Sequence, residues 1–244
     1  MRRKVNGRLV VALAMALLLA AQIAAASSFG LAPLGLSISG RESSGSIVAQ
    51  NNGDGTIVLQ VKTLRWTQQD GKDVREETRD LLANPPIFKL APGEQQLVRF
   101  AQRTGPPAED EVAYRAIFTE VPPEVEPQSS AAFRIALAMD VPVYVEPVAR
   151  VNPPPALRWR IERSASGLQV IAENPGNMHF RVTEAEFGTY GKILHKQGIL
   201  VVLPKSTLVL NMPPPPSTAT LIQLSAVDGE NLPVTFEIQL PAAP

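Results

Sequence analysis

Residues 131–147 read AAFRIALAMDVPVYVEP, and this stretch carries the strongest structural signal in the sequence. A large apolar residue stands at every second position, so in an extended chain these side chains point to one face. The four residues are Phe133, Ile135, Leu137 and Met139. The pattern predicts a strand of about 14 residues, where about five or six is usual. Such a strand either fills the core of a β-sandwich or pairs with another chain, and the residues alone allow both.

Shorter runs of alternating or continuous apolar residues flank this stretch on both sides. Proline accounts for 23 of the 244 residues, and a proline inside a helix costs about 3 kcal/mol. The combination favours an all-β fold of the sandwich type. The expected strands are residues 46–50, 56–67, 95–101, 112–121, 132–145, 157–163, 168–174, 178–190, 199–203, 207–212, 219–227 and 234–240.

Some segments between the strands have a distinct composition. Residues 68–83 are rich in charge, and we expect a solvated connection there with at most a short helical turn. Residues 51–55 (NNGDG) and 174–177 (NPGN) contain Asn and Gly, which tolerate positive φ. These two segments are expected to form tight turns.

The chain divides at a proline-rich linker. Residues 147–155 (PVARVNPPP) end in three prolines, which favour a stiff, extended segment. We expect an N-terminal domain of residues 27–147 and a C-terminal domain of residues 148–244, each of the size of an immunoglobulin-like sandwich. Residues 1–26 combine a basic start, an apolar run and a small-residue cleavage site, which is typical of a secretory signal peptide.

Charge and composition exclude several classes of function. Without residues 1–26, 19 basic residues stand against 23 acidic ones, a net charge of −4, which excludes a strongly basic nucleic-acid binder. No second apolar stretch is long enough to span a membrane. The chain has no Cys, so disulfides, thiol nucleophiles and thiolate metal sites are excluded. We expect a soluble protein without nucleic-acid partner, membrane insertion or cofactor.

A search for catalytic motifs yields little. The two His residues, His179 and His195, belong to no metal-binding or hydrolase motif. We expect His179 to lie at the surface or to be satisfied by a hydrogen bond. His195 stands between Lys192 and Lys196, where positive charge disfavours a metal ion. We expect neither catalytic residues nor a metal site.

Several motifs nevertheless follow one another in a specific order. They are residues 51–54 (NNGD), 64–66 (LRW), 84–99 (NPPIFKLAPGEQQLVR), 114–123 (YRAIFTEVPP) and 141–145 (VPVYV). In this order they resemble the periplasmic pilus, or fimbrial, chaperones of chaperone–usher systems, the PapD-like family. The PPIF and VPVYV forms look similar to the archaic branch of that family.

The resemblance implies two immunoglobulin-like domains set at an angle, located in the periplasm. It implies that the long strand is lent to pilin subunits, which lack a strand of their own, in donor-strand complementation. By resemblance the donor side chains are Phe133, Ile135, Leu137 and Met139, and the loaded subunit is passed to an outer-membrane usher.

The sequence departs from the family at the expected anchor for the subunit's C-terminal carboxylate. The family uses an Arg and a Lys, and a gap-free match places Gly35 and Pro142 there. Neither side chain donates a hydrogen bond, so Arg41 or Arg134 is a candidate substitute, as is Lys62. The position of an expected interdomain arginine is held by Glu146.

Two other functions remain open on the sequence alone. One is a secreted two-domain surface or adhesive module, which would bind a host ligand without a pilin. The other is a periplasmic hydrolase, which the absence of a nucleophile–base–metal set argues against. An exposed apolar strand also makes a self-capping homodimer one state open to the free protein.

Overall fold

The computed structural model describes residues 29–122, 136–149, 157–164, 167–189, 191–215, 219–228 and 233–240, where every regular element is a β-strand. The first group is β1 (Phe29–Ala32), β2 (Leu36–Ile38), β3 (Ser44–Asn51), β4 (Ile57–Gln69), β5 (Lys72–Glu77), β6 (Leu81–Asn84), β7 (Ile87–Leu90), β8 (Gln95–Gln102), β9 (Val112–Glu120) and β10 (Ala138–Val145). The second group is β11 (Arg158–Ser164), β12 (Gly167–Glu173), β13 (Phe180–Thr189), β14 (Lys192–Gln197), β15 (Leu200–Val202), β16 (Thr207–Met212), β17 (Leu221–Asp228) and β18 (Pro233–Gln239). Within the described ranges no helix could cross a membrane.

Strands β1 to β10 form an immunoglobulin-like sandwich of two sheets. One sheet has the order β1-β3-β8-β6, and the other has β2-β10-β9-β4-β5 with β7 also paired to β4. The core lies between them, where Phe100 of β8 meets Phe118 of β9 edge to face, with ring centroids 6.2 Å apart. Both rings are fully buried, and burial of each stabilises the fold by roughly 1.5–3 kcal/mol.

Strands β11 to β18 form a second sandwich with its own core. Its sheets have the orders β11-β12-β16 and β14-β13-β17-β18, with β15 paired to β13. Trp159 of β11 packs against Phe187 of β13 and Phe236 of β18. Among the described strands no sheet mixes the two groups, and we keep the division at residue 147 as a proposal.

A buried asparagine organises the same kind of turn in each sandwich. The Asn51 side chain donates to the carbonyl oxygens of Gly55 (2.7 Å) and Leu90 (3.1 Å), and accepts from the Gly53 N–H (2.9 Å). Asn174 repeats the arrangement with Met178, Val202 and Gly176, at 2.8, 2.9 and 2.8 Å. The polar sequences at residues 51–55 and 174–177 are therefore turns held from inside the protein.

The expectation for residues 68–83 is wrong. In place of a solvated loop the chain forms a β-hairpin, in which β4 continues to Gln69 and β5 pairs back onto it. Asp70 and Gly71 form the turn with φ of 50° and 75°, the positive values that a two-residue hairpin needs. The Asp-Gly pair signals such a turn, and the surrounding charge obscured it.

The remaining strand expectations agree with the structure, apart from short strands that the pattern missed. The missed strands are β1, β2, β6, β7 and β14. The strand expected at residues 132–145 is present from Ala138 to Val145. The signal peptide, the donor residues Phe133 and Ile135, and linker residues 150–156 lie outside the described residues.

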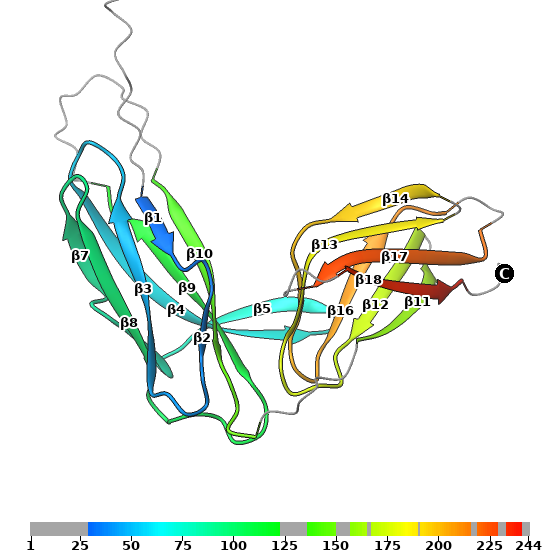
Figure 1. The fold of residues 1–244 in the computed structure, drawn as a ribbon, viewed down its shortest axis with the longest axis horizontal. Coiled ribbons are helices and arrows are strands. Elements are labelled where there is room, and N and C mark those ends of the chain that lie inside the picture. The colour runs from blue at the N-terminus through cyan, green and yellow to red at the C-terminus, as the bar shows by residue number, and fades with distance from the viewer. Residues whose placement is uncertain are drawn as a thin grey trace, which may run out of the picture.

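The two sandwiches are set at an angle, and one hairpin bridges them. In Figure 1 the β4–β5 hairpin extends from the first sandwich toward β16 of the second. At its tip the Val209 N–H donates to the Gly71 carbonyl oxygen at 3.1 Å. The β4–β5 hairpin, which the sequence analysis did not predict, is thus part of the contact between the domains.

Candidate functional site

Strand β10 lies near the edge of the six-stranded sheet. On one side it pairs with β9 along its whole length, from Ala138 to Val145. On the other side only Val143–Val145 pair, with β2 in parallel. Among the described strands, residues 138–142 therefore have no partner on that side. Pro142 fits this position, since proline in a sheet is confined to edges, strand starts and bulges.

One face of β10 continues the apolar core toward the free edge. Val141, Val143 and Val145 are buried in the first core, and Leu137 and Met139 pack half-buried against the same core. The alternation predicted from the sequence is present at these positions. The predicted donor residues Phe133 and Ile135, and the candidate anchor Arg134, lie outside the described residues.

A cavity of about 790 Å³ lies beside β10, between the two sandwiches. One wall is the outer face of the six-stranded sheet, and the other comes from residues at β13, β15 and β16. Gly35 and Pro142 line this cavity next to each other, so the two expected anchor positions do meet. Arg41 is exposed and does not line the cavity, and Lys62 lines a separate groove.

The cavity contains two arginines that share one carboxylate. The Nε atom of Arg115 donates to Asp140 Oδ1 at 2.6 Å, and Nη1 of Arg75 donates to Asp140 Oδ2 at 2.6 Å. The Arg115 guanidinium also lies 4.9 Å from the centre of the Trp66 ring. Sequence reasoning did not single out either arginine as a site residue, although Arg115 belongs to the motif at residues 114–123.

Two buried donors in the same cavity lack a hydrogen-bond partner. Trp66 Nε1 and the Tyr144 hydroxyl have none among the described residues, and both residues are buried, with 4% and 5% of their surface exposed. Burial, with a smaller effect from the Glu111 carboxylate, raises the pKa of the Tyr144 hydroxyl well above its ordinary value. Tyr144 therefore keeps its proton and remains a donor at physiological pH.

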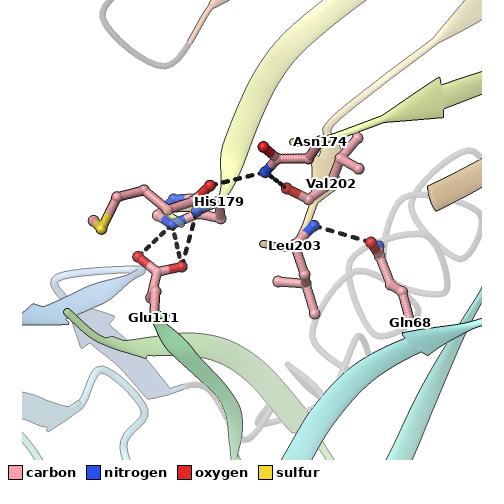
Figure 2. Close-up of polar contacts among 7 residues, drawn as sticks. Gln68, Glu111, Asn174, His179, Val202 and Leu203 are labelled. Carbon is pink, nitrogen blue, oxygen red and sulfur yellow. Dashed lines mark hydrogen bonds and ion pairs between the residues drawn. The ribbon is translucent and has the colours of Figure 1, made fainter. Parts of the chain in front are cut away.

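A polar cluster next to the cavity joins the two sandwiches. The Nδ1 atom of His179 lies 2.8 and 2.9 Å from the two carboxylate oxygens of Glu111, and the His179 backbone N–H donates to the same carboxylate at 3.1 Å. Figure 2 shows this pair together with the bonds of Asn174. The expectation that His179 is surface-exposed or satisfied is confirmed, because its imidazole is satisfied across the domain contact.

A second contact lies where β4 meets β15. Gln68 accepts from the Leu203 N–H at 2.9 Å, as Figure 2 shows, and donates to the Val201 carbonyl oxygen at 2.8 Å. The Leu203 side chain is buried with Trp66 and Tyr144 of the first sandwich. Polar and apolar contacts thus fix the second domain against the face that carries Tyr144.

Residues 28–150 match the family described as pili and flagellar-assembly chaperone, PapD N-terminal domain. The chain belongs to this family of pilus assembly chaperones. The match covers the first sandwich and about half of the sequence, and it includes β10 and every first-domain residue of the cavity. Members of the family are chaperones of the periplasm. The family match confirms the resemblance that the sequence motifs indicate.

The structure of this pilus chaperone is similar to solved chaperone structures over most of its length. One is a chain of the CsuC–CsuE chaperone–tip adhesion subunit pre-assembly complex from the archaic Csu pili of Acinetobacter baumannii, with 20% identity and a TM-score of 0.67 over 87% of this chain and 98% of that one. The YadV chaperone has 16% identity and a TM-score of 0.65, over 87% and 99%. A chain of the SafA pilin–SafB chaperone complex of Salmonella enterica has 18% and 0.61, over 88% and 97%. These structural similarities establish the shared two-domain fold.

A curated relative is similar in sequence over a shorter range. It is the uncharacterized fimbrial chaperone YhcA of Escherichia coli strain K12, 27% identical over 104 residues. The alignment spans 42% of this chain and 45% of the relative.

Proposed function

We propose that this chaperone binds pilin subunits by donor-strand complementation along β10. The observation that supports the proposal is the free edge at residues 138–142, combined with apolar side chains on one face. An extended segment of a partner can pair with that edge, and main-chain hydrogen bonds then supply affinity. In this account Phe133, Ile135, Leu137 and Met139 enter a groove of the subunit, where burial of each contributes roughly 1.5–3 kcal/mol before ordering costs.

Family membership and the amino-terminal sequence support the proposed cellular setting. With residues 1–26 as a secretory signal, the chaperone acts in the periplasm, where it holds a subunit in a state ready for assembly. It then transfers the subunit to an outer-membrane usher. In the absence of a subunit, the same edge pairs with a second copy to give a self-capped homodimer.

The experiment is co-expression with candidate pilin subunits, that is, small secreted β-proteins, followed by affinity purification. Leu137→Asp places a charge on the apolar face that is proposed to enter the subunit's groove. Ala136→Asp places the same charge at the neighbouring, exposed position, which points to the opposite face. The chaperone should retain the subunit in the wild type and in Ala136→Asp, and should lose it in Leu137→Asp. Circular dichroism and thermal unfolding must show that both variants are folded.

Equal retention by the two variants would refute groove insertion by this face. Binding of a carbohydrate or host protein, with no subunit retained, would instead favour the surface-module alternative.

A further inference from the structure

The backbone groups of β10 point alternately to its two sides. On one side the Leu137 carbonyl oxygen accepts from the Glu120 N–H of β9 at 2.9 Å. On the other side, just after the strand, the Glu146 N–H donates to the Ile38 carbonyl oxygen of β2 at 2.9 Å. Because successive residues of a strand direct their N–H and C=O groups to opposite sides, odd-numbered residues of β10 face β9. Even-numbered residues therefore face β2 and, beyond it, the free edge.

Pro142 lies where the pairing between β10 and β2 stops. The parallel register joins Val145 to Ile38 and ends with Val143 opposite Leu36. In a parallel ladder the next bond would run from the N–H of residue 142 to the carbonyl oxygen of Leu34. Residue 142 faces this side, but a proline has no N–H to donate. That bond cannot form, and β2 begins only at Leu36.

The chain ahead of β2 leaves the strand at this point. Residues 33–35 cross from β1, which pairs with β3 in the opposite sheet, to β2. The crossing segment nevertheless lies next to β10, because a Cβ added to Gly35 would lie 3.7 Å from the Pro142 Cγ atom. Leu34 is 66% exposed, so its side chain is not held in a core. Little except a hydrogen-bond donor is therefore needed for this segment to follow β10.

A donor at position 142 would let β2 continue along the edge. After a bond from residue 142 to the Leu34 carbonyl oxygen, the Leu34 N–H would reach the Asp140 carbonyl oxygen. A carbonyl oxygen accepts two hydrogen bonds, and Arg115 Nη2 supplies one to Asp140 at 3.3 Å. Leu34 would then compete with a partner strand for the same edge group.

We propose that Pro142 keeps the edge of β10 open for a bound subunit strand, because it ends the chaperone's own pairing with β2. The inference rests on the proposed function, in which a pilin strand pairs with residues 138–141. Proline on an edge strand commonly blocks pairing with other chains. Here it blocks an extension within the chain and leaves the neighbouring edge to the partner. Pro142 is thus a positioning residue, which acts through the course of β2.

The test compares the wild type with Pro142→Ala and Pro142→Val, which both restore an N–H and differ in side-chain size. NMR of the free chaperone, at a dilution where it is monomeric, measures hydrogen exchange of the Leu34 amide. Competition between wild type and variant for a limited amount of the co-expressed pilin subunit gives their relative affinities. Pro92→Ala, at an exposed turn position, is the control for the loss of a proline. Circular dichroism must show that each variant is folded.

In both Pro142 variants the Leu34 amide should exchange about tenfold more slowly, because it gains a bond in the sheet. Both variants should capture about fivefold less subunit than the wild type, because one main-chain group of the edge is then occupied. Pro92→Ala should match the wild type in both measurements. Unchanged exchange at Leu34, or equal capture by variant and wild type, overturns the inference. An effect of Pro142→Val that Pro142→Ala does not share also overturns it, because the side chain and not the N–H would then be the cause.

These outcomes separate from those of the pilin experiment. If Leu137→Asp abolishes subunit retention but Leu34 exchanges alike in all variants, only the role of Pro142 fails. If the wild type retains no subunit, the proposed function fails, and with it the claim that the edge is kept open for a pilin. Slower exchange at Leu34 would in that case still show that Pro142 ends β2.

Discussion

The imidazole ring of His179 lies flat on the phenol ring of Tyr144, with ring centroids 3.7 Å apart and planes 7° from parallel. Tyr144 belongs to β10, the strand with the free edge, and His179 precedes β13 of the second sandwich. The same imidazole bonds the Glu111 carboxylate, whose side chain is wholly buried. His179 therefore joins the second domain both to β10 and to Glu111 of the first domain, and we expect the angle between the domains to depend on it.

The Glu111–His179 pair should contribute measurably to stability. His179→Ala removes the imidazole and leaves a buried carboxylate with only the backbone N–H as donor, so we expect a loss of about 2–3 kcal/mol in the free energy of unfolding. Urea denaturation measures it, and small-angle scattering of the folded variant should show a wider distribution of domain angles. His195→Ala, at a half-buried position of β14, is the control. A loss below about 0.5 kcal/mol, as for ordinary surface substitutions, would show that the pair does not hold the domains.

The Tyr144 hydroxyl should make stability depend on pH at alkaline values. Because burial raises its pKa in the folded state, the neutral form stabilises the fold fully below about pH 10, the ordinary tyrosine pKa. Above that pH the unfolded chain loses its proton first, and stability falls by about 1.4 kcal/mol per pH unit from this group. Tyr144→Phe should remove this component of the slope and cost little near neutrality, since the hydroxyl has no partner to lose. Identical slopes for the two proteins between pH 10 and 12 would contradict the assignment.

The two turn asparagines should be equivalent in their own domains. Asn174→Ala leaves two buried carbonyl groups without their side-chain donor, and Asn51→Ala leaves one buried and one part-buried, so each should cost about 2–4 kcal/mol. Differential scanning calorimetry should show a lower unfolding temperature for the sandwich that carries the substitution than for the same sandwich in the wild type. Asn52→Ala, at the exposed neighbouring position, should change little. A comparable effect of Asn52→Ala would mean that the local backbone, and not the buried side chain, determines the loss.

The hairpin tip offers a measurement of the contact between domains. Gly71 and Gly93 both have φ of 75°, but an added Cβ at Gly71 would meet Val209, while one at Gly93 would meet nothing within 4 Å. Alanine at either position brings the same backbone strain, of order 1–3 kcal/mol. Gly71→Ala should cost more than Gly93→Ala and should alter the domain angle seen by small-angle scattering. Equal costs and equal scattering would mean that the hairpin does not press on β16.

The sequence was sufficient for the fold because its patterns are local. Alternation along β10 and the Asn-Gly turns reflect the geometry of one strand or one turn, and both are present in the structure. The β4–β5 hairpin was missed because charge on an exposed strand resembles charge in a loop. In the sequence, the Asp70-Gly71 pair is the feature that distinguishes the two, because these residues adopt the positive φ of a two-residue turn.

The polar groups of the cavity could not be predicted in the same way. Arg75 and Asp140 are 65 positions apart in sequence, and they meet only because β5, β4, β9 and β10 pair in that order. Arg115 belongs to the Tyr-Arg motif by which the family was noticed, yet that motif says nothing of its neighbours. Gly35 and Pro142, the two positions at which the family carries its anchor, line one cavity in the structure. The sequence does not say which side chains surround them, because those come from strands far apart in the chain.

Hydrogen–deuterium exchange at residues 136–141, with and without a co-purified pilin subunit, tests donor-strand binding most directly. In the free chaperone, at a dilution where it is monomeric, the edge amides of this segment have no partner on one side among the described strands, so they should exchange rapidly. Pairing with a subunit strand should protect the segment by at least about 100-fold, while β12 in the second core stays unchanged. Unaltered exchange at residues 136–141 in a stable complex would contradict the account, because the subunit would then bind elsewhere on the chaperone.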